Sequence, residues 1–295
     1  MNSKWLLFSS SLVLAACGGA PAAPATPATP ATPAVPTAPA TPSTDSAKVD
    51  APKVDTAKPE APKAEAPLPA HVKAAIEAAD RDADDKAVDA GRHPGQLLSF
   101  CGVPAGGKVA EIAAGGGYTT ELLARTVGPT GKVYGQNNKW ILEKFAEKPW
   151  AARVAKPVNK GVVVRADREF EDPLPADAKN LDVVVDNLFY HDTFWMKVDR
   201  DKMNKAIFAA LKPGGVYCVI DHSGRPGTGS TEVQTLHRIE EKVVKEEIEK
   251  AGFKLSAESP VWRNAADTRD WNAAPFAAKE KRGTSDRFAF KFVKP

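Results

Sequence analysis

One stretch, residues 109–123, constrains the fold of this chain more than any other. An apolar run over 109–112 leads into the letters AAGGG at 113–117, and a helical pattern begins at once from Tyr118. Glycine has no Cβ, so such a turn can bend sharply and a ligand can approach the main chain closely. The following helix directs free N–H groups and its positive dipole end at the turn. A strand, a glycine turn and a helix in this order predict a nucleotide-type site in an open α/β sheet.

The first residues read as an export signal and not as part of the fold. Residues 5–15 are mostly apolar but too few to span a bilayer, and small residues follow before Cys17. Leu14-Ala15-Ala16-Cys17 resembles the lipobox of bacterial lipoproteins, a family in which the cysteine becomes the lipidated N-terminus. In that family Gly18 after the cysteine favours the outer membrane. We therefore expect a signal peptide over 1–16 and a lipid anchor at Cys17 on the periplasmic side of the envelope; the alternative is an ordinary secretory signal with a chance cysteine.

The next segment, 17–68, is built from Pro, Ala and Thr and then from Lys, Asp and Glu. Such a composition cannot bury a core, so we expect a disordered, extended linker that lifts a domain off a membrane. Residues 69–295 have the length of one folded domain. The chain has a formal net charge of +3 with acids and bases mixed and no basic stripe, so nucleic acid is not an expected partner.

Short apolar strands alternate with helices along 69–295, which predicts an α/β fold with a parallel sheet covered on both faces. Two final strands, joined by irregular sequence, suggest an antiparallel strand near the end of the sheet. The expected strands are 108–113, 132–136, 162–164, 181–185, 217–221, 253–259 and 287–293, and the expected helices are 71–80, 94–100, 118–127, 140–147, 199–211 and 233–251.

Cys101 and Cys218 are interpreted as small buried apolar residues. Two thiols do not make a disulfide framework, and no cysteine or histidine spacing resembles a zinc motif, so no metal site is expected.

Four segments together resemble the class I S-adenosylmethionine-dependent methyltransferases, over about residues 92–293. They are residues 111–117, NLFYHD at 187–192, LKPGG at 211–215 and DHSGRPG at 221–227. The resemblance is closest to a bacterial group of predicted methyltransferases of unassigned substrate. It implies a three-layer Rossmann-like fold with a seven-stranded, mostly parallel sheet whose last strand is antiparallel, and it implies S-adenosylmethionine as the cofactor.

The resemblance also assigns cofactor-binding residues around the glycine turn. Glu111 would lie under the methionine part of the cofactor, although it can also brace the loop by accepting N–H groups. Gly115 and Gly117 match the second and third glycines of the family's loop, and Ala113 stands in the place of the first.

Two further positions concern the nucleoside. The family places an acid after the second strand to grip both ribose hydroxyls, whereas this chain has Asn137, which offers one carbonyl and one amide. Asp167 matches the acid that accepts the adenine amino group, and its alternative role is that of a solvated loop acid.

The catalytic candidates lie beyond the fourth strand. In the family Asp186 faces the reacting methyl group. His191 is a candidate general base because an imidazole near its ordinary pKa can accept a proton, and Tyr190 is a candidate for orienting the substrate. His191 and His222 can equally be structural, while His237 is expected to begin a charged helix and to be solvated.

The expected function is methyl transfer from S-adenosylmethionine to an unidentified small-molecule or envelope acceptor. Holding nucleophile, carbon and sulfur in line accounts for most of such catalysis. A nicotinamide-dependent reductase is disfavoured because Thr120 replaces a third glycine and Asn137 replaces an acid. A metal hydrolase built on His191, Asp192 and His222 is a weaker alternative. The main rival is a non-catalytic, lipid-tethered binding protein on a methyltransferase scaffold.

Overall fold

The computed structural model describes residues 67–295. The predicted signal peptide, the lipid anchor at Cys17 and almost all of the linker therefore lie outside the described residues. Among the helices of residues 67–295, none combines the length and the apolar character that crossing a membrane requires.

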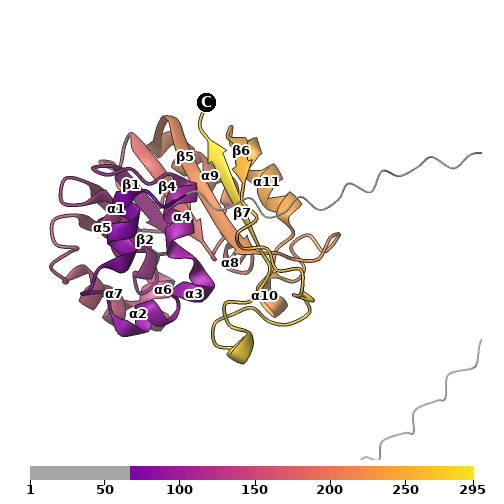
Figure 1. Ribbon diagram of the computed structural model, residues 1–295. Helices are drawn as coiled ribbons and strands as arrows, with labels where there is room; N and C mark the ends of the chain where they lie inside the picture. Colours follow the sequence, from indigo (N-terminus) through magenta and orange to yellow (C-terminus); the bar gives the residue numbers. More distant parts are fainter. Residues whose placement is uncertain (1–66) are drawn as a thin grey trace, which may run out of the picture. The chain divides into compact units, whose positions relative to one another are not determined.

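A seven-stranded sheet organises the described chain (Figure 1). Its strands lie in the order β3-β2-β1-β4-β5-β7-β6; strands β1 to β5 pair in parallel, and β7 runs antiparallel to both β5 and β6. This arrangement confirms the predicted fold class. The strands are β1 (Lys108–Ile112), β2 (Lys132–Asn137), β3 (Val163–Asp167), β4 (Leu181–Asn187), β5 (Leu211–His222), β6 (Lys254–Glu258) and β7 (Arg287–Val293).

Helices cover both faces of the sheet. Successive side chains of a strand point to opposite faces, so a strand that is apolar throughout must be covered on both sides. On β4, Val183 and Val185 belong to a core cluster with residues of α1, α4, α5 and α7, whereas Val184 belongs to a second cluster with residues of α9 and α11. All three valines are buried, as a strand covered on both sides requires. The helices are α1 (Ala70–Glu77), α2 (Ala83–Ala87), α3 (Asp89–Arg92), α4 (Pro94–Cys101), α5 (Tyr118–Val127), α6 (Lys139–Ile141), α7 (Glu147–Val154), α8 (Asp192–Trp195), α9 (Arg200–Ala210), α10 (Val233–Leu236) and α11 (Glu241–Lys250), with a π-helical turn η1 (Leu142–Ala146) and a 3₁₀ turn η2 (Lys279–Lys281).

One predicted strand and two predicted helices differ from the structure: the strand expected at 217–221 is β5, which already begins at Leu211. The helix expected at 140–147 continues to Val154, through the π-helical turn η1 into α7. The helix expected over 233–251 is wrong as a single element. The chain takes a left-handed conformation at His237 (φ 50°), which ends α10, and Ile239 then donates its N–H to the carbonyl of His222 before α11 begins.

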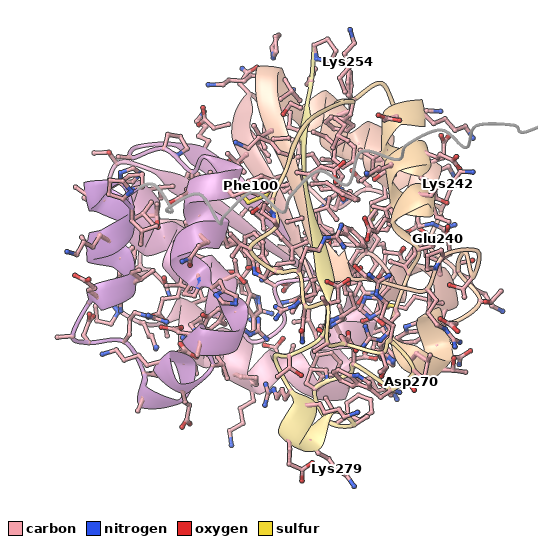
Figure 2. All side chains as sticks on the ribbon, turned by 45° about the vertical axis from the view of Figure 1, so that its right-hand side comes forward. Phe100, Glu240, Lys242, Lys254, Asp270 and Lys279 are labelled. Atoms are coloured by element: carbon pink, nitrogen blue, oxygen red, sulfur yellow. A yellow bond between two sulfur atoms is a disulfide. The ribbon has the colours of Figure 1, made fainter. Side chains whose placement is uncertain are left out.

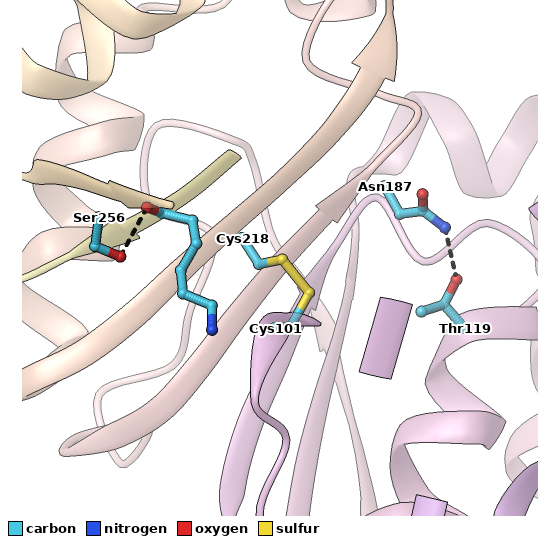
Figure 3. The surroundings of a disulfide bond; sticks show 6 residues. Cys101, Thr119, Asn187, Cys218 and Ser256 are labelled. Atoms are coloured by element: carbon cyan, nitrogen blue, oxygen red, sulfur yellow. Dashed lines mark hydrogen bonds between the residues drawn. A yellow bond between two sulfur atoms is a disulfide. The ribbon is translucent and has the colours of Figure 1, made fainter. Parts of the chain in front are cut away.

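A disulfide bond joins the end of α4 to β5. Cys101 and Cys218 lie 117 residues apart in sequence with Cα atoms 5.5 Å apart, and both are fully buried (Figure 3). Their burial was predicted correctly, but their interpretation as separate apolar residues is wrong. The sequence contains no indication that two cysteines so far apart along the chain meet. In the structure their Cα separation near 5.5 Å is typical of a disulfide.

The irregular segment 259–286 is fixed by ion pairs. Arg238 and Asp267 form a fully buried pair at 2.8 Å, and Arg269 pairs with Asp286 at 2.6 Å. Asp270 and Lys279, labelled in Figure 2, belong to the same segment, and Lys279 is exposed. These ion pairs therefore anchor a segment in which the regular secondary structure is limited to the short 3₁₀ turn η2.

Candidate functional site

Two adjoining cavities lie where the carboxyl ends of β1, β4 and β5 meet. The order of the sheet reverses between β1 and β4, and ligands of open α/β sheets bind at such a point. The first cavity has a volume of about 330 Å³ and the second about 690 Å³. Both are lined by Ala113, Asn187, Leu188, Asp192, His237 and Pro275.

The glycine turn opens directly onto these cavities. Gly115 has φ 55°, and a Cβ placed on it would meet no atom within 4 Å. Ala113 adopts the same left-handed region (φ 53°), and its N–H is held by Gln136 Oε1 at 2.9 Å. Left-handed backbone costs an alanine roughly 1 kcal/mol, so the Gln136 contact helps to keep the alanine in the conformation that glycine favours. The turn is thus built without its first glycine and is not plugged by side chains at Gly115.

Asn137 is committed to the same turn. Its Oδ1 accepts the Gly115 N–H at 2.8 Å, and its Nδ2 donates to the Gly115 carbonyl at 3.1 Å. The side chain is fully buried. Both polar groups of Asn137 are therefore occupied, and gripping a ribose would require breaking these bonds.

Asp167 does not reach the site. It lies at the exposed end of β3, where it forms an ion pair with Arg165 at 2.8 Å, and it lines neither of the two cavities. The structure therefore does not bring Asp167 together with Glu111 and Gly115.

Glu111 and Arg92 form the polar end of the first cavity. Burial raises the pKa of Glu111 to about 7, although the hydroxyls of Thr120 and Thr119 and the charge of Arg92 act in the opposite direction. The Thr120 hydroxyl donates to Glu111 Oε2. Arg92 comes from the short helix α3, which belongs to no recognisable motif, so nothing in the sequence identified it.

Of the three catalytic candidates, only His191 lines a cavity. Asp186 is fully buried at the end of β4, where burial and the neighbouring Asp221 raise its pKa well above the ordinary range. Tyr190 is also fully buried; its hydroxyl donates to Glu247 Oε2 at 2.9 Å and accepts from Asn204 Nδ2 at 2.9 Å. Tyr190 is therefore not placed to touch a substrate in either cavity, contrary to the expectation that it orients one.

His191 is held between carboxylates. Its Nδ1 lies 2.7 Å from Asp221 Oδ1, and its main-chain N–H donates to Asp221 Oδ2 at 2.7 Å. Burial by itself lowers the pKa of His191, but Asp221 and Asp192 outweigh it and raise the pKa to about 10. The premise of a near-neutral pKa is therefore not met in this arrangement.

Two more imidazoles converge on His191. Its ring centroid lies 5.7 Å from that of His222 and 5.4 Å from that of His237. His222 is tied to Ser285 Oγ through Nδ1 at 2.7 Å. The expectation that His237 is solvated is wrong: the left-handed turn after α10 brings it into the lining of both cavities. The pattern of residues 233–251 predicted one long helix, so this turn was not predicted.

Asn187 completes the rim between β4 and α5. Its Nδ2 donates to Thr119 Oγ1 at 3.3 Å (Figure 3). The first residues of α5 and the end of β4 are thereby joined beside the glycine turn.

No family model matches the chain, whereas solved structures do. An S-adenosylmethionine-dependent methyltransferase from Aquifex aeolicus aligns with a TM-score of 0.50 and 18% identity over 73% of this chain and 100% of that one. A chain of the complex between the Haloferax volcanii Trm112 methyltransferase activator and a methyltransferase aligns with a TM-score of 0.50 and 20% identity over 72% and 93%. The [4+2]-cyclase SpnF aligns with a TM-score of 0.51 and 15% identity over 70% and 82%. At such identities the likeness is one of fold, and a fold hosts more than one reaction. The described chain thus has the Rossmann-like fold that these structures, two of them of methyltransferases, share.

Proposed function

We propose that this protein is an S-adenosylmethionine-dependent methyltransferase with an unidentified small-molecule or envelope acceptor. The observation that carries the proposal is the open main chain at Gly115, at the reversal point of the sheet. A cofactor can lie against such a turn without meeting a side chain.

The cavities fit the two ends of the cofactor. Glu111 and Arg92 would hold the amino and carboxylate groups of its methionine part, since opposite charges pair with them there. The second cavity is lined by Trp140, Ile141 and Phe189, apolar surfaces that suit an adenine ring. Asn137 is bonded to Gly115, so we expect the ribose to be held less firmly than by an acid. When bound, the cofactor supplies an already activated methyl group.

The chain's own contribution to catalysis is positioning. His191 and Asn187 line the first cavity and would contact the acceptor. Asp186 lies buried behind them, and Tyr190 fixes the 187–192 loop through Glu247, so we assign these two as positioning residues. Alignment of acceptor and methyl group is the main requirement of the reaction.

Calorimetry of the full chain with S-adenosylmethionine, and with its demethylated product, tests the binding step. Gly115→Asn places a side chain in the open space, and asparagine tolerates the left-handed backbone. We expect a loss of affinity of at least about tenfold, since 1.4 kcal/mol of lost contact is enough. Gly229→Asn is the matched control, because Gly229 has φ 54° and an equally open Cβ position but lines neither cavity. Absence of binding at millimolar ligand, or equal binding by Gly115→Asn, contradicts the proposal.

Transfer itself is tested with a labelled methyl group. The full chain is incubated with labelled S-adenosylmethionine and a cell-envelope extract, and label should enter the extract only when the intact glycine turn is present. Binding without any transfer would instead indicate the tethered binding protein.

We also propose that Cys17 anchors the protein by lipid in the cell envelope, on the periplasmic side of the outer membrane. The disulfide between Cys101 and Cys218 supports an address outside the cytoplasm, because such bonds persist in oxidising compartments. Cys17→Ser should abolish incorporation of labelled fatty acid and release the protein from the membrane fraction.

A further inference from the structure

Three potential metal ligands converge at the rim of the two cavities. His191 and Asp192 come from the loop after β4 and the start of α8, and His237 comes from the turn after α10. One donor atom from each lies within 4.8 Å of the others. Nδ1 of His237 is buried and has no hydrogen-bond partner among the described residues, whereas the buried Nε2 of His191 has the Asp192 carboxylate beside it at 3.1 Å. Buried polar atoms are nearly always partnered, so Nδ1 of His237 requires an explanation.

We infer that His191, Asp192 and His237 form a binding site for a divalent transition metal of the zinc type. Two imidazoles and a carboxylate are the donors that zinc and its neighbours prefer, whereas calcium and magnesium take oxygen ligands. In a tetrahedral site, metal–ligand bonds of about 2.0–2.2 Å place donor atoms about 3.4 Å apart. The three donor atoms lie within 4.8 Å of one another, so the side chains would move closer together when the metal binds. Three protein ligands leave a coordination position open toward the cavity.

The surroundings already orient the ligands. Asp221 accepts from Nδ1 of His191 at 2.7 Å and is fixed in turn by the main-chain N–H groups of His191 and His222, each at 2.7 Å. Trp195 Nε1 donates to Asp192 Oδ1 at 2.6 Å. Metal-binding histidines commonly have such a carboxylate behind the non-ligating nitrogen, where it fixes the ring orientation.

A simple ion pair accounts for part of the cluster only. His191 Nε2 lies 3.1 Å from Asp192 Oδ1, and His237 Nε2 lies 3.8 Å from the same oxygen. These ion pairs leave Nδ1 of His237 buried with no partner among the described residues, on a residue that also adopts a left-handed backbone. A metal ion would use all three side chains and would explain why the chain places His237 in the cavity.

The open coordination position would face the acceptor end of the first cavity, next to Asn187 and His222. A metal there would hold an acceptor through an oxygen, nitrogen or sulfur atom. This last point rests on the proposed function; the metal site does not.

Cobalt titration of the full chain tests the site, because the visible bands of Co²⁺ report coordination by nitrogen directly. The chain carries Cys17→Ser and no affinity tag, so that its unpaired thiol cannot bind the metal; Cys101 and Cys218 are joined in the disulfide. We expect one Co²⁺ per chain, displaced by Zn²⁺. His237→Asn and Asp192→Asn should each weaken binding at least tenfold, and Asp221→Asn by about 10- to 100-fold. His71→Asn, whose ring contacts the Val103 carbonyl far along the chain from the cluster, is the control and should bind as the parent does.

Three results would overturn the inference: no Co²⁺ bands at millimolar metal, unchanged binding by His237→Asn, or an equal loss in His71→Asn. Thermal melting of each variant accompanies the titration, and His237→Gln replaces His237→Asn if the latter does not melt cooperatively. Calorimetry with S-adenosylmethionine on the same samples separates the two proposals, because loss of the metal site leaves the Gly115 turn intact.

Discussion

Gly117 lies directly against the indole ring of Trp150. A Cβ on Gly117 would come within 2.7 Å of Trp150 Cζ3 and of Arg153 Cγ, and Trp150 is fully buried. Gly115, two residues earlier, faces open space instead. The two glycines of the turn therefore have different roles. Gly117 lets α7 pack against α5, and Gly115 leaves room for a ligand.

Gly117→Ala should destabilise the fold by about 2–4 kcal/mol, the sum of overpacking against Trp150 and an alanine at φ 81°. Urea unfolding measures the change. Gly229→Ala, with a similar backbone but no close neighbour, should lose only about 1 kcal/mol. Equal losses in the two variants would show that packing against Trp150 is unimportant.

Asn137→Asp restores the acid that the resemblance implies, but it should not improve cofactor binding. A carboxylate can still accept the Gly115 N–H but cannot donate to the Gly115 carbonyl, so a buried oxygen loses its partner. We expect a loss of about 1–3 kcal/mol in unfolding free energy. A tighter complex with S-adenosylmethionine at unchanged stability would contradict this.

Glu111→Gln should change the pH dependence of stability. The pKa of Glu111 is about 7 when folded against 4.5 for an ordinary glutamate, so the folded protein binds this proton more tightly. Stability from this group therefore falls as pH rises from about 4.5 to 7, by up to about 3 kcal/mol. The variant should lack that fall, in thermal melts between pH 4 and 8. Exposed Glu143→Gln is the control and should keep it.

Glu121→Gln should act in the opposite sense. Burial opposes ionisation of Glu121, yet its contacts with Lys156, Arg153 and Arg125 lower its pKa to about 2. Its stabilising contribution is present above pH 4.5 and is lost as pH falls toward 2. At neutral pH the variant should be less stable by about 3 kcal/mol, and the difference should shrink in acid. A difference that stays constant with pH would refute the assignment.

Replacing both Cys101 and Cys218 by alanine should lower stability by about 4 kcal/mol, because the bond closes a long loop in the unfolded chain. Reduction of the disulfide in the unmodified protein should also lower its melting temperature. The double variant should be insensitive to reductant, and any remaining sensitivity would indicate another redox group.

The fold was predictable because its signals are local and repeated. Helix α5 and strand β7 begin and end where the sequence placed them, since Gly117 and Gly128 bracket one and alternation marks the other. The glycine turn, Glu111 and His191 were found because they lie at or shortly after the carboxyl ends of apolar strands.

The features that were not predicted depend on contacts between distant parts of the chain. The residue type of Asn137 suggested a ribose ligand, because the sequence does not reveal that its side chain bonds to the backbone groups of Gly115. His237 enters the cavity through a single left-handed residue inside a helical pattern. Strands β1 to β4 lie between Cys101 and Cys218 in the sequence, so the proximity of the two cysteines depends on the tertiary arrangement of the sheet.

The segment 259–286 forms one wall of both cavities through Pro275, and it is anchored by the buried Trp262 and by ion pairs such as that of Arg238 with Asp267. We expect substitutions at exposed positions between those anchors to leave the registers of the sheet unchanged. Relatives that process different compounds would then diverge first along this strip, and exchanging it between them offers a direct route to altered selectivity.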